Sequence, residues 1–318
     1  MFTIALIGTG AIGSRYLQGM IKIRKKVDIL AVEPLKSSSQ NAINLWNEVG
    51  GKKSKHNIQY VNNLNGIKKK FDLVIIATSS QDRPNLIKEV RQKLKPNYWI
   101  IEKILAQSET GLKMIKKYTY NSSGVWVNKP RRLMHWHKKL KTKFNGKGPL
   151  SIEKIGGLWG LTCNSIHFID LVCWWTGESL LSLNSNELDK KWFKSKRANY
   201  YEITGKLKAR FSGGTKLTLI SNKNKKSNLL KVKTLDNKLW IIDEQRSEAY
   251  SSEGIFLNGK LENQSDFTGN LLNKIIAKKK CDLPTLKESY KQHKIFLKEL
   301  IKHWNSSQNS QDKEIPIT

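Results

Sequence analysis

The stretch Thr3-Ile4-Ala5-Leu6-Ile7-Gly8-Thr9-Gly10-Ala11-Ile12-Gly13 decides the fold that the sequence predicts. Its first five residues are mostly apolar, as expected of a strand that is buried on both faces. Gly8, Gly10 and Gly13 form the pattern G-x-G-x-x-G, and a helical pattern follows over 12–23. In this context the first glycine makes a tight turn, the second lets a pyrophosphate approach the backbone, and the third lets the helix pack on the strand. The stretch therefore predicts an α/β domain that binds a dinucleotide.

Strand and helix patterns alternate through the rest of the first third of the chain. Further short apolar runs predict strands over 27–32, 72–77, 98–101 and 124–127, and helical patterns lie over 42–49 and 84–94. Strands that alternate with helices at this spacing are joined by right-handed crossovers, which produce a parallel sheet. Residues 1–124 are therefore predicted to form a Rossmann domain.

The second half of the sequence has a different pattern. A helix-like apolar run over 167–175 is followed by alternation of apolar and basic residues over 203–220. Turns are predicted at Gly213-Gly214, Asp236-Asn237 and Asn258-Gly259. Such alternation indicates a mainly antiparallel, open sheet with one covered face. With an amphipathic helix over 286–304, residues 125–305 are predicted to form an α/β domain for substrate binding and oligomerisation, and 306–318 a polar, frayed tail.

Composition and charge narrow the class of protein. The 318 residues include 48 Lys and 9 Arg and carry a formal charge of +31. Nucleic-acid readers concentrate charge on one face and depend on Arg for bidentate contacts, whereas Lys is spread along this whole chain. Cys163, Cys173 and Cys281 have neither disulfide nor zinc spacing. No apolar window reaches membrane-spanning length, and no signal peptide is evident. We expect a cytoplasmic protein without a nucleic-acid or membrane partner, with polyanion binding as a minor alternative.

An acidic residue follows the second predicted strand. Glu33 lies 20 residues after Gly13, where a carboxylate accepts hydrogen bonds from the adenosine ribose of a bound dinucleotide. A carboxylate there repels a 2′-phosphate, so NAD is favoured over NADP. The segment Lys36-Ser37-Ser38-Ser39 comes next and suits a 2′-phosphate, so NADP stays open. The predicted cofactor contacts in this part of the chain are Gly8, Thr9, Gly10, Ala11, Ile12, Gly13 and Glu33.

Several later motifs carry a resemblance to a known family. Ala77-Thr78-Ser79 follows the third strong strand, Glu102-Lys103 ends the next, and a glycine-rich stretch precedes a helix with His167 and Asp170. In this order and spacing, the chain resembles the glucose–fructose oxidoreductase/inositol dehydrogenase (Gfo/Idh/MocA) family over nearly its whole length. Two further matching stretches are Phe211-Ser212-Gly213-Gly214 and Leu283-Pro284-Thr285-Leu286. The resemblance implies a Rossmann domain, a second domain with an open sheet, and NAD(P)-dependent oxidation or reduction of sugar-like substrates.

The resemblance also implies roles for individual residues. Lys103 would hydrogen-bond the reacting oxygen and favour the developing alkoxide, and His167 would serve as the second proton-transfer group. Ala77, Thr78, Ser79, Glu102, Lys103 and Asn128 would complete the cofactor site. Arg131, Arg132, Asn164, His167 and Asp170 would contact the substrate, and the adjacent arginines suit a substrate that is anionic.

Three positions depart from the family pattern. Ile104 replaces the family's Pro, and we expect the turn to relax if the family's Lys-Pro bond is cis. Cys163 replaces an Asp four residues before His167. Arg83 stands where relatives often carry His, and the sequence assigns it no role. The first two departures leave open a catalytically reduced regulatory or accessory protein. A separate alternative is an enzyme that retains bound NAD and uses transient oxidation for elimination or hydrolysis. A homo-oligomer also stays open.

Overall fold

The structure, a computed structural model, describes residues 1–144, 146–225, 227–260 and 262–318. These form two compact units. The first unit consists of Met1–Ala106, Thr110–Leu133 and Glu262–Leu286, and the second of Gln107–Glu109, Met134–Leu261 and Lys287–Thr318. The first unit thus contains most of the predicted Rossmann segment and a later stretch near residue 270. The second includes the C-terminal residues that the sequence sets apart as a tail.

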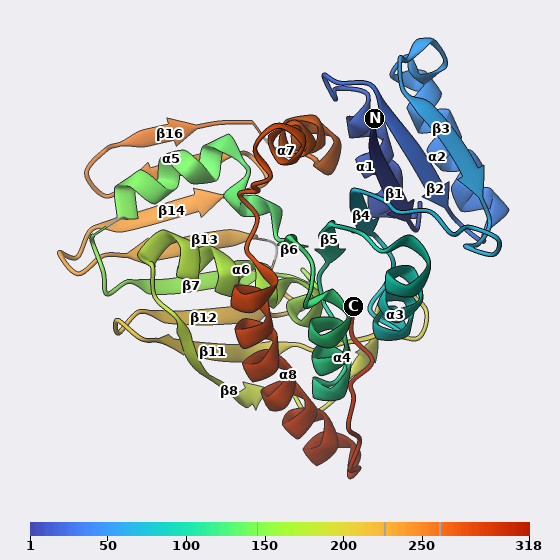
Figure 1. The fold of residues 1–318 in the computed structure, drawn as a ribbon. Helices are drawn as coiled ribbons and strands as arrows, with labels where there is room; N and C mark the ends of the chain where they lie inside the picture. Colours follow the sequence, from blue (N-terminus) through green and yellow to red (C-terminus); the bar gives the residue numbers. More distant parts are fainter. Residues whose placement is uncertain (145, 226, 261) are drawn as a thin grey trace. The chain divides into compact units, whose positions relative to one another are not determined.

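The first unit contains a six-stranded sheet in the order β3-β2-β1-β4-β5-β6, in which every pairing is parallel (Figure 1). The strands are β1 (Phe2–Ile7), β2 (Val27–Val32), β3 (Asn57–Val61), β4 (Leu73–Ile76), β5 (Tyr98–Glu102) and β6 (Gly124–Asn128). Five of the six strands and the parallel arrangement were predicted. The sequence does not predict β3, because this edge strand has polar Asn57 and Gln59 and only half-buried apolar residues.

Four helices form the crossovers of this sheet and a fifth joins from later in the chain. They are α1 (Ala11–Met20), α2 (Lys36–Glu48), α3 (Arg83–Leu94), α4 (Glu109–Thr119) and α7 (Gln264–Lys278). Right-handed crossovers place α1 and α2 on one face and α3 and α4 on the other. Helix α7 packs against α1, where a Cβ added to Gly19 would lie 2.7 Å from Thr268 Cβ. Buried aliphatic residues such as Ile4, Leu6 and Leu272 fill the space between sheet and helices.

The order of the strands reverses direction between β1 and β4. The chain moves outward from β1 in one direction through β2 and β3, and in the other through β4, β5 and β6. In open parallel sheets, ligands bind at the carboxyl ends of the strands beside such a reversal. The glycine stretch follows β1, and Ala77-Thr78-Ser79 follows β4, so both lie at the reversal.

The second unit is built on an eight-stranded sheet in the order β16-β15-β14-β13-β7-β12-β11-β8 (Figure 1). Its strands are β7 (Ser151–Gly156), β8 (Leu180–Leu188), β11 (Gly205–Phe211), β12 (Lys216–Ser221), β13 (Leu229–Lys233), β14 (Leu239–Asp243), β15 (Glu248–Ser251) and β16 (Phe256–Asn258). Only the β7–β12 pair is parallel. A separate short hairpin joins β9 (Phe193–Lys194) to β10 (Tyr201–Glu202). Helices α5 (His135–Phe144), α6 (Leu161–Thr176) and α8 (Leu286–Gln308) complete the unit, which confirms the predicted mainly antiparallel sheet.

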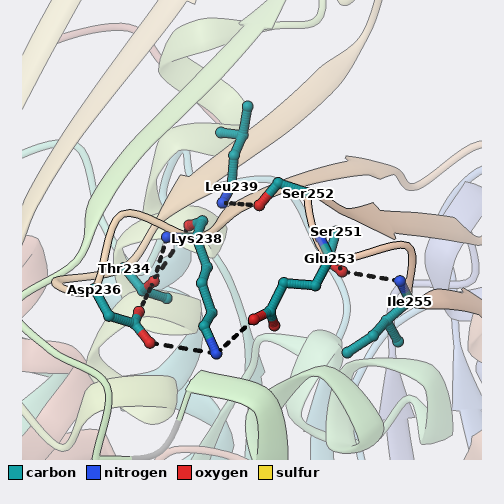
Figure 2. A network of polar contacts seen from close by, with 8 residues as sticks. All are labelled: Thr234, Asp236, Lys238, Leu239, Ser251, Ser252, Glu253 and Ile255. Atoms are coloured by element: carbon teal, nitrogen blue, oxygen red, sulfur yellow. Dashed lines mark hydrogen bonds and ion pairs between the residues drawn. The ribbon is translucent and has the colours of Figure 1, made fainter.

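The predicted hairpin turns have different outcomes. Asp236-Asn237 joins β13 to β14, and Asn237 adopts a left-handed φ of 64°, as an Asn in a hairpin turn does. The prediction for Asn258-Gly259 is wrong, because β16 ends at Asn258 and its turn to β15 comes earlier, where Gly254 has a φ of 79°. Figure 2 shows the two hairpin tips joined by Lys238, whose Nζ lies 3.5 Å from Asp236 Oδ2 and 2.8 Å from Glu253 Oε1.

The C-terminal segment is packed against the second unit. Ile315 and Ile317 are fully buried, and the amide of Tyr201 donates to the carbonyl of Pro316 at 2.9 Å. The predicted frayed tail is therefore wrong. Burial of the two apolar isoleucines stabilises the folded segment, although the residues before them are polar. Among the described residues, no helix is both long enough and apolar enough to cross a membrane.

Candidate functional site

The glycine turn after β1 has the shape that its sequence predicts. Gly8 has a φ of 88°, and a Cβ at this position would lie 2.9 Å from Thr78 Cγ2. A Cβ on Gly13 would lie 1.9 Å from the carbonyl oxygen of Gly8, so the helix could not approach the turn with any larger residue. Gly10 is different, because an added Cβ would meet no atom within 4 Å. Two glycines thus serve packing, and the third borders open space.

The N-terminus of α1 is left without a side-chain cap. Gly10 is its N-cap residue and has no side chain, and among the described residues no side chain accepts a hydrogen bond from the amides of the first turn. Such amides, together with the helix dipole, attract an anion. The nearby acid, Glu33, instead accepts hydrogen bonds from the amide of Thr9 at 2.7 Å and from the amide of Leu35 at 3.1 Å. Glu33 therefore fixes the loop beside the helix and leaves the helix terminus open.

Two buried threonine hydroxyls border the same turn. Thr9 is 1% exposed, and neither its Oγ1 nor that of Thr78 has a hydrogen-bond partner among the described residues. Buried hydroxyls are normally hydrogen-bonded, so each such exception calls for an explanation. Both follow strands that pair with each other, β1 and β4, at the reversal of strand order. Polar groups of this kind fit a ligand that reaches the turn.

Lys103 directly follows β5. It therefore lies at the carboxyl ends of the strands, as the glycine turn does, two strands away from that turn. Its side chain is half-buried. The peptide bond between Lys103 and Ile104 is cis, so the expected relaxation of this turn is wrong. The buried Arg83 guanidinium holds the segment by donating to the carbonyl oxygens of Glu102 and Ile104.

Glu102, the residue before Lys103, belongs to a network of buried polar side chains. Glu102 is 7% exposed, and Asn128 Nδ2 donates both to Glu102 Oε1 and, at 2.9 Å, to Gln264 Oε1. Burial raises the pKa of Glu102, while the Asn128 hydrogen bond and then the charges of Lys103 and Arg83 oppose this rise. Burial, followed by the charge of Glu102, also raises the pKa of Tyr16. Glu102 and Asn128, predicted as cofactor contacts, are thus neighbours in the folded chain.

The predicted substrate arginines belong to the first unit. Arg131 and Arg132 lie in a short 3-10 helix, η2 (Pro130–Arg132), that follows β6. Arg131 is half-buried, and Arg132 is 8% exposed. The structure therefore connects them to the strand that carries Asn128, rather than to the start of the second unit as the sequence predicts.

The remaining predicted residues lie in the second unit, on α6. His167 and Asn164 are half-buried, and Asn164 Nδ2 donates to the carbonyl of Trp159 at 2.7 Å. Asp170 is 1% exposed and accepts a hydrogen bond from Gln292 Nε2 of α8 at 3.4 Å. Asp170 therefore faces a helix of its own unit.

The N-terminus of α6 is capped by a residue far along the chain. Glu202 of β10 accepts hydrogen bonds from the amide of Thr162 at 2.8 Å and from the amide of Cys163 at 3.1 Å. Glu202 is 8% exposed. A carboxylate is thus present at the place where Cys163 replaces the family's Asp, although it comes from a different strand.

Hydrogen bonds and close packing join most of the predicted cofactor residues into one continuous set in the first unit. The set runs from Glu33 through the glycine turn to Thr78, and through Arg83 and Glu102 to Asn128. Arg83, Glu202, Gln264 and Tyr16 were not predicted. No motif signals these contacts, because each of the four residues interacts with at least one segment that is remote in the sequence.

Comparison with known proteins agrees with this geometry. A family model described as ketopantoate reductase PanE/ApbA matches residues 4–102, which lie in the first unit. No curated protein sequence matches significantly. This model represents a family other than Gfo/Idh/MocA, and it covers less than half of the chain.

Solved structures match over both units. An oxidoreductase from Agrobacterium radiobacter, in complex with NAD+, L-tartaric acid and magnesium, is 12% identical over 96% of this chain and 97% of that one, with a TM-score of 0.67. Apo scyllo-inositol dehydrogenase from Lactobacillus casei is 13% identical over 93% and 94%, with a TM-score of 0.63. Biliverdin reductase from Synechocystis, in complex with biliverdin and NADP+, is 13% identical over 94% and 97%, with a TM-score of 0.68.

The chain has the fold of these oxidoreductases. The fold that the Gfo/Idh/MocA resemblance implies is confirmed, with its parallel N-terminal sheet and its mostly antiparallel second sheet. At this level of identity, the likeness concerns the fold, and function must be argued from the residues themselves.

Proposed function

We propose that this protein is an NAD(P)-dependent oxidoreductase that acts on a hydroxyl or keto group of a sugar-like substrate. The observation that carries the proposal is the uncapped N-terminus of α1 behind Gly10, beside the carboxylate of Glu33. Similar solved structures that contain NAD+ or NADP+ support the same class of cofactor.

The residues of the first unit fit such a dinucleotide. The open space at Gly10 and the free amides of α1 suit a pyrophosphate. Each oxygen of Glu33 accepts one backbone amide and has lone-pair capacity left for ribose hydroxyls. The buried hydroxyls of Thr9 and Thr78 offer further partners. We assign Ala11, Ile12, Ala77 and Ser79 to the walls of this site, and Glu102 and Asn128 to its far end.

The proposed chemistry uses two proton-handling side chains. A bound nicotinamide supplies the hydride acceptor or donor. The Nζ of Lys103 donates a hydrogen bond to the reacting oxygen, and its charge stabilises the alkoxide that forms when an alcohol loses its proton. His167 of the second unit takes up or returns that proton at neutral pH. In this proposal the imidazole of His167 transfers the proton, and the ammonium of Lys103 stabilises the charge.

We assign substrate contacts to the polar residues that follow these groups. Arg131 and Arg132 bind an anionic group of the substrate through bidentate hydrogen bonds. Asn164 contributes a polar contact near the start of α6. We assign Asp170 to this group as well, with its carboxylate held by Gln292 of α8.

NAD is the favoured cofactor, and a cytoplasmic enzyme that assembles into a homo-oligomer completes the proposal. The preference rests on Glu33, which repels a 2′-phosphate at the ribose. Neither nucleic acid nor a membrane is proposed as a partner, since the excess of Lys over Arg is dispersed along the sequence.

Binding of the dinucleotide is tested by substituting the open glycine. Gly10→Val should fold, since its Cβ meets no atom within 4 Å, but should obstruct the pyrophosphate and abolish NADH and NADPH binding in calorimetry. Gly13→Val is the matched contrast, because its Cβ would overlap the Gly8 carbonyl, and we expect it to melt at a much lower temperature. Unchanged binding in Gly10→Val would remove the site.

Turnover is tested separately, by following absorbance of the reduced nicotinamide with sugars, sugar acids and nucleotide sugars. The rival function, a regulatory or accessory protein, predicts dinucleotide binding without turnover. Cys163 favours this rival, because the family's Asp is missing. Cys163→Asp would add a carboxylate beside that of Glu202, so we now expect a less stable α6 along with any gain in rate. A regulator would stay inert after this change.

A further inference from the structure

Arg83 is a fully buried cation next to the proposed site. It is the first residue of α3 and is 1% exposed. Its Nη1 donates to the carbonyl oxygens of Glu102 at 2.7 Å, of Ile104, and of Leu105 at 3.4 Å. Its Nη2 donates to the carbonyl oxygen of Thr78. One guanidinium therefore contacts two segments, the turn after β4 and the segment that ends β5.

The position of these acceptors relative to Lys103 is informative. The carbonyls of Glu102 and Ile104 lie on either side of Lys103 in the chain, so the main chain is anchored before and after that residue. The fourth acceptor belongs to Thr78, whose methyl carbon would lie 2.9 Å from a Cβ added to Gly8. Arg83 thus links the backbone of Lys103 to the glycine turn through a single rigid group.

Arginine is suited to this task and lysine is not. The guanidinium is planar and holds its donors in a fixed fork, which can satisfy carbonyls on two segments at once. An ammonium is a compact group with all its donors on one atom. Burial of the Arg83 charge is also balanced by Glu102, because the charge of Arg83 opposes the rise that burial causes in the pKa of that carboxyl.

We propose that Arg83 is a positioning residue that sets the location of Lys103 relative to the glycine turn. The inference rests on the proposed function, in which Lys103 contacts the reacting oxygen. In this proposal Arg83 contacts neither substrate nor cofactor and acts through the backbone carbonyls that it holds. The competing explanation is a brace that merely stabilises the first unit.

Arg83→Lys separates the two explanations, since it keeps the charge and most of the side-chain volume but loses the fork. We expect kcat to fall about 10²-fold, as for a misplacement of roughly 1 Å, with a much smaller change in NADH affinity. Arg91→Lys is the matched control on the same helix, because among the described residues Arg91 Nη1 donates a hydrogen bond to the Pro96 carbonyl alone, at 3.3 Å. An Arg83→Lys variant with wild-type turnover and melting temperature overturns the proposal.

Chemical rescue gives a second readout, in which recovery of kcat distinguishes a positioning role from a purely stabilising one. Arg83→Ala leaves a space lined by carbonyl oxygens, which a free guanidinium ion can occupy. We expect guanidinium chloride, at concentrations that do not unfold the protein, to restore part of the lost kcat, whereas sodium chloride and methylammonium chloride do not. Rescue of the melting temperature without rescue of kcat would support the brace and overturn positioning.

A third measurement does not depend on turnover. Competitive labelling with trace acetic anhydride, read by mass spectrometry, compares the reactivity of Lys103 with that of the exposed Lys278. We expect Arg83→Ala to change this ratio, and guanidinium to return it toward the wild-type value. If the protein binds no dinucleotide but the ratio responds, the proposed function fails and the role of Arg83 in placing Lys103 stands. An unresponsive ratio in a folded variant overturns that role.

Discussion

The N-termini of α1 and α6 differ in how a nearby carboxylate is used. Beside α1, Glu33 accepts amides of Thr9 and Leu35, which lie outside the helix, and no side chain caps the helix itself. Beside α6, Glu202 accepts the amides of Thr162 and Cys163, which belong to the first turn. The first-turn amides of one helix are therefore left without a side-chain cap, and those of the other are satisfied within the chain.

The comparison shows that a helix N-terminus is a ligand site only where the fold leaves it open. The dipole and the free amides are common to every helix, so they do not distinguish the two sites. The placement of one carboxylate relative to the first turn does. The predictions that follow test this difference.

The largest effect is expected at Lys103, which lies at the same strand edge as the open terminus. Lys103→Ala should reduce turnover by about 10²–10⁴-fold, as for loss of a general acid or base, with little change in dinucleotide affinity. His167→Ala tests the second unit in the same steady-state assay. A loss with Lys103→Ala alone would assign the chemistry to the first unit, and a loss with neither would reject the mechanism.

Glu33→Ala tests the carboxylate beside the open terminus. Both dinucleotides should bind more weakly because the Thr9 amide loses its acceptor, but the affinity for NADP relative to NAD should rise roughly tenfold, about the value of one charged hydrogen bond. Calorimetric titration with both cofactors measures the ratio, and Glu33→Gln is the control that removes only the charge. An unchanged ratio would place Glu33 outside the ribose site.

Glu202→Ala tests the capped terminus. Loss of the cap should reduce the free energy of unfolding by about 0.5–2 kcal/mol, and Glu202→Gln should lose less because its amide oxygen still accepts. Denaturant unfolding measures both. Dinucleotide affinity should not change, since the cap and Glu33 belong to different units. Equal stability of all three proteins would mean that Glu202 is not a working cap.

Glu102 is a third carboxylate to compare with Glu33 and Glu202. It is buried, but it does not lie at a helix N-terminus. Because its folded pKa is raised above the ordinary value of 4.5, the folded state holds its proton more tightly than the unfolded state. Stability should therefore fall as the pH rises from about 4.5 through the raised value. Glu102→Gln should flatten this part of the profile in urea unfolding between acid and neutral pH. The same slope in both proteins would contradict the assignment.

The smallest effect is expected at the hairpin tips shown in Figure 2. Lys238 joins Asp236 to Glu253, and those carboxylates and the ammonium are well exposed. Exposed ion pairs contribute little because solvent screens them. Lys238→Ala should leave the melting temperature and dinucleotide affinity unchanged within error. A clear loss of stability would mean that this exposed ion pair contributes more to the free energy of unfolding than solvent screening allows.

Much of the fold follows from local pattern. Apolar runs, helical periodicity and the glycine spacing predicted five of the six parallel strands, since each is a property of a few adjacent residues. Edge strand β3 was missed because it is only half-buried, and the turn at Asn258-Gly259 was misplaced because Gly254 offers a left-handed φ earlier. The C-terminal isoleucines were assigned to a tail because their burial depends on residues far away in the sequence.

The sequence alone determined which residues make the glycine turn, that Glu33 stands beside it and that Lys103 follows the end of a strand, because these depend on local pattern and spacing along the chain. Only the tertiary structure decided how the three are held. Arg83 reaches across two strand ends, Asn128 and Gln264 support Glu102, and Glu202 caps α6 from 39 residues or more away. Hydrogen bonds and buried charges of this kind act between segments that no periodicity relates, so they are decided by packing.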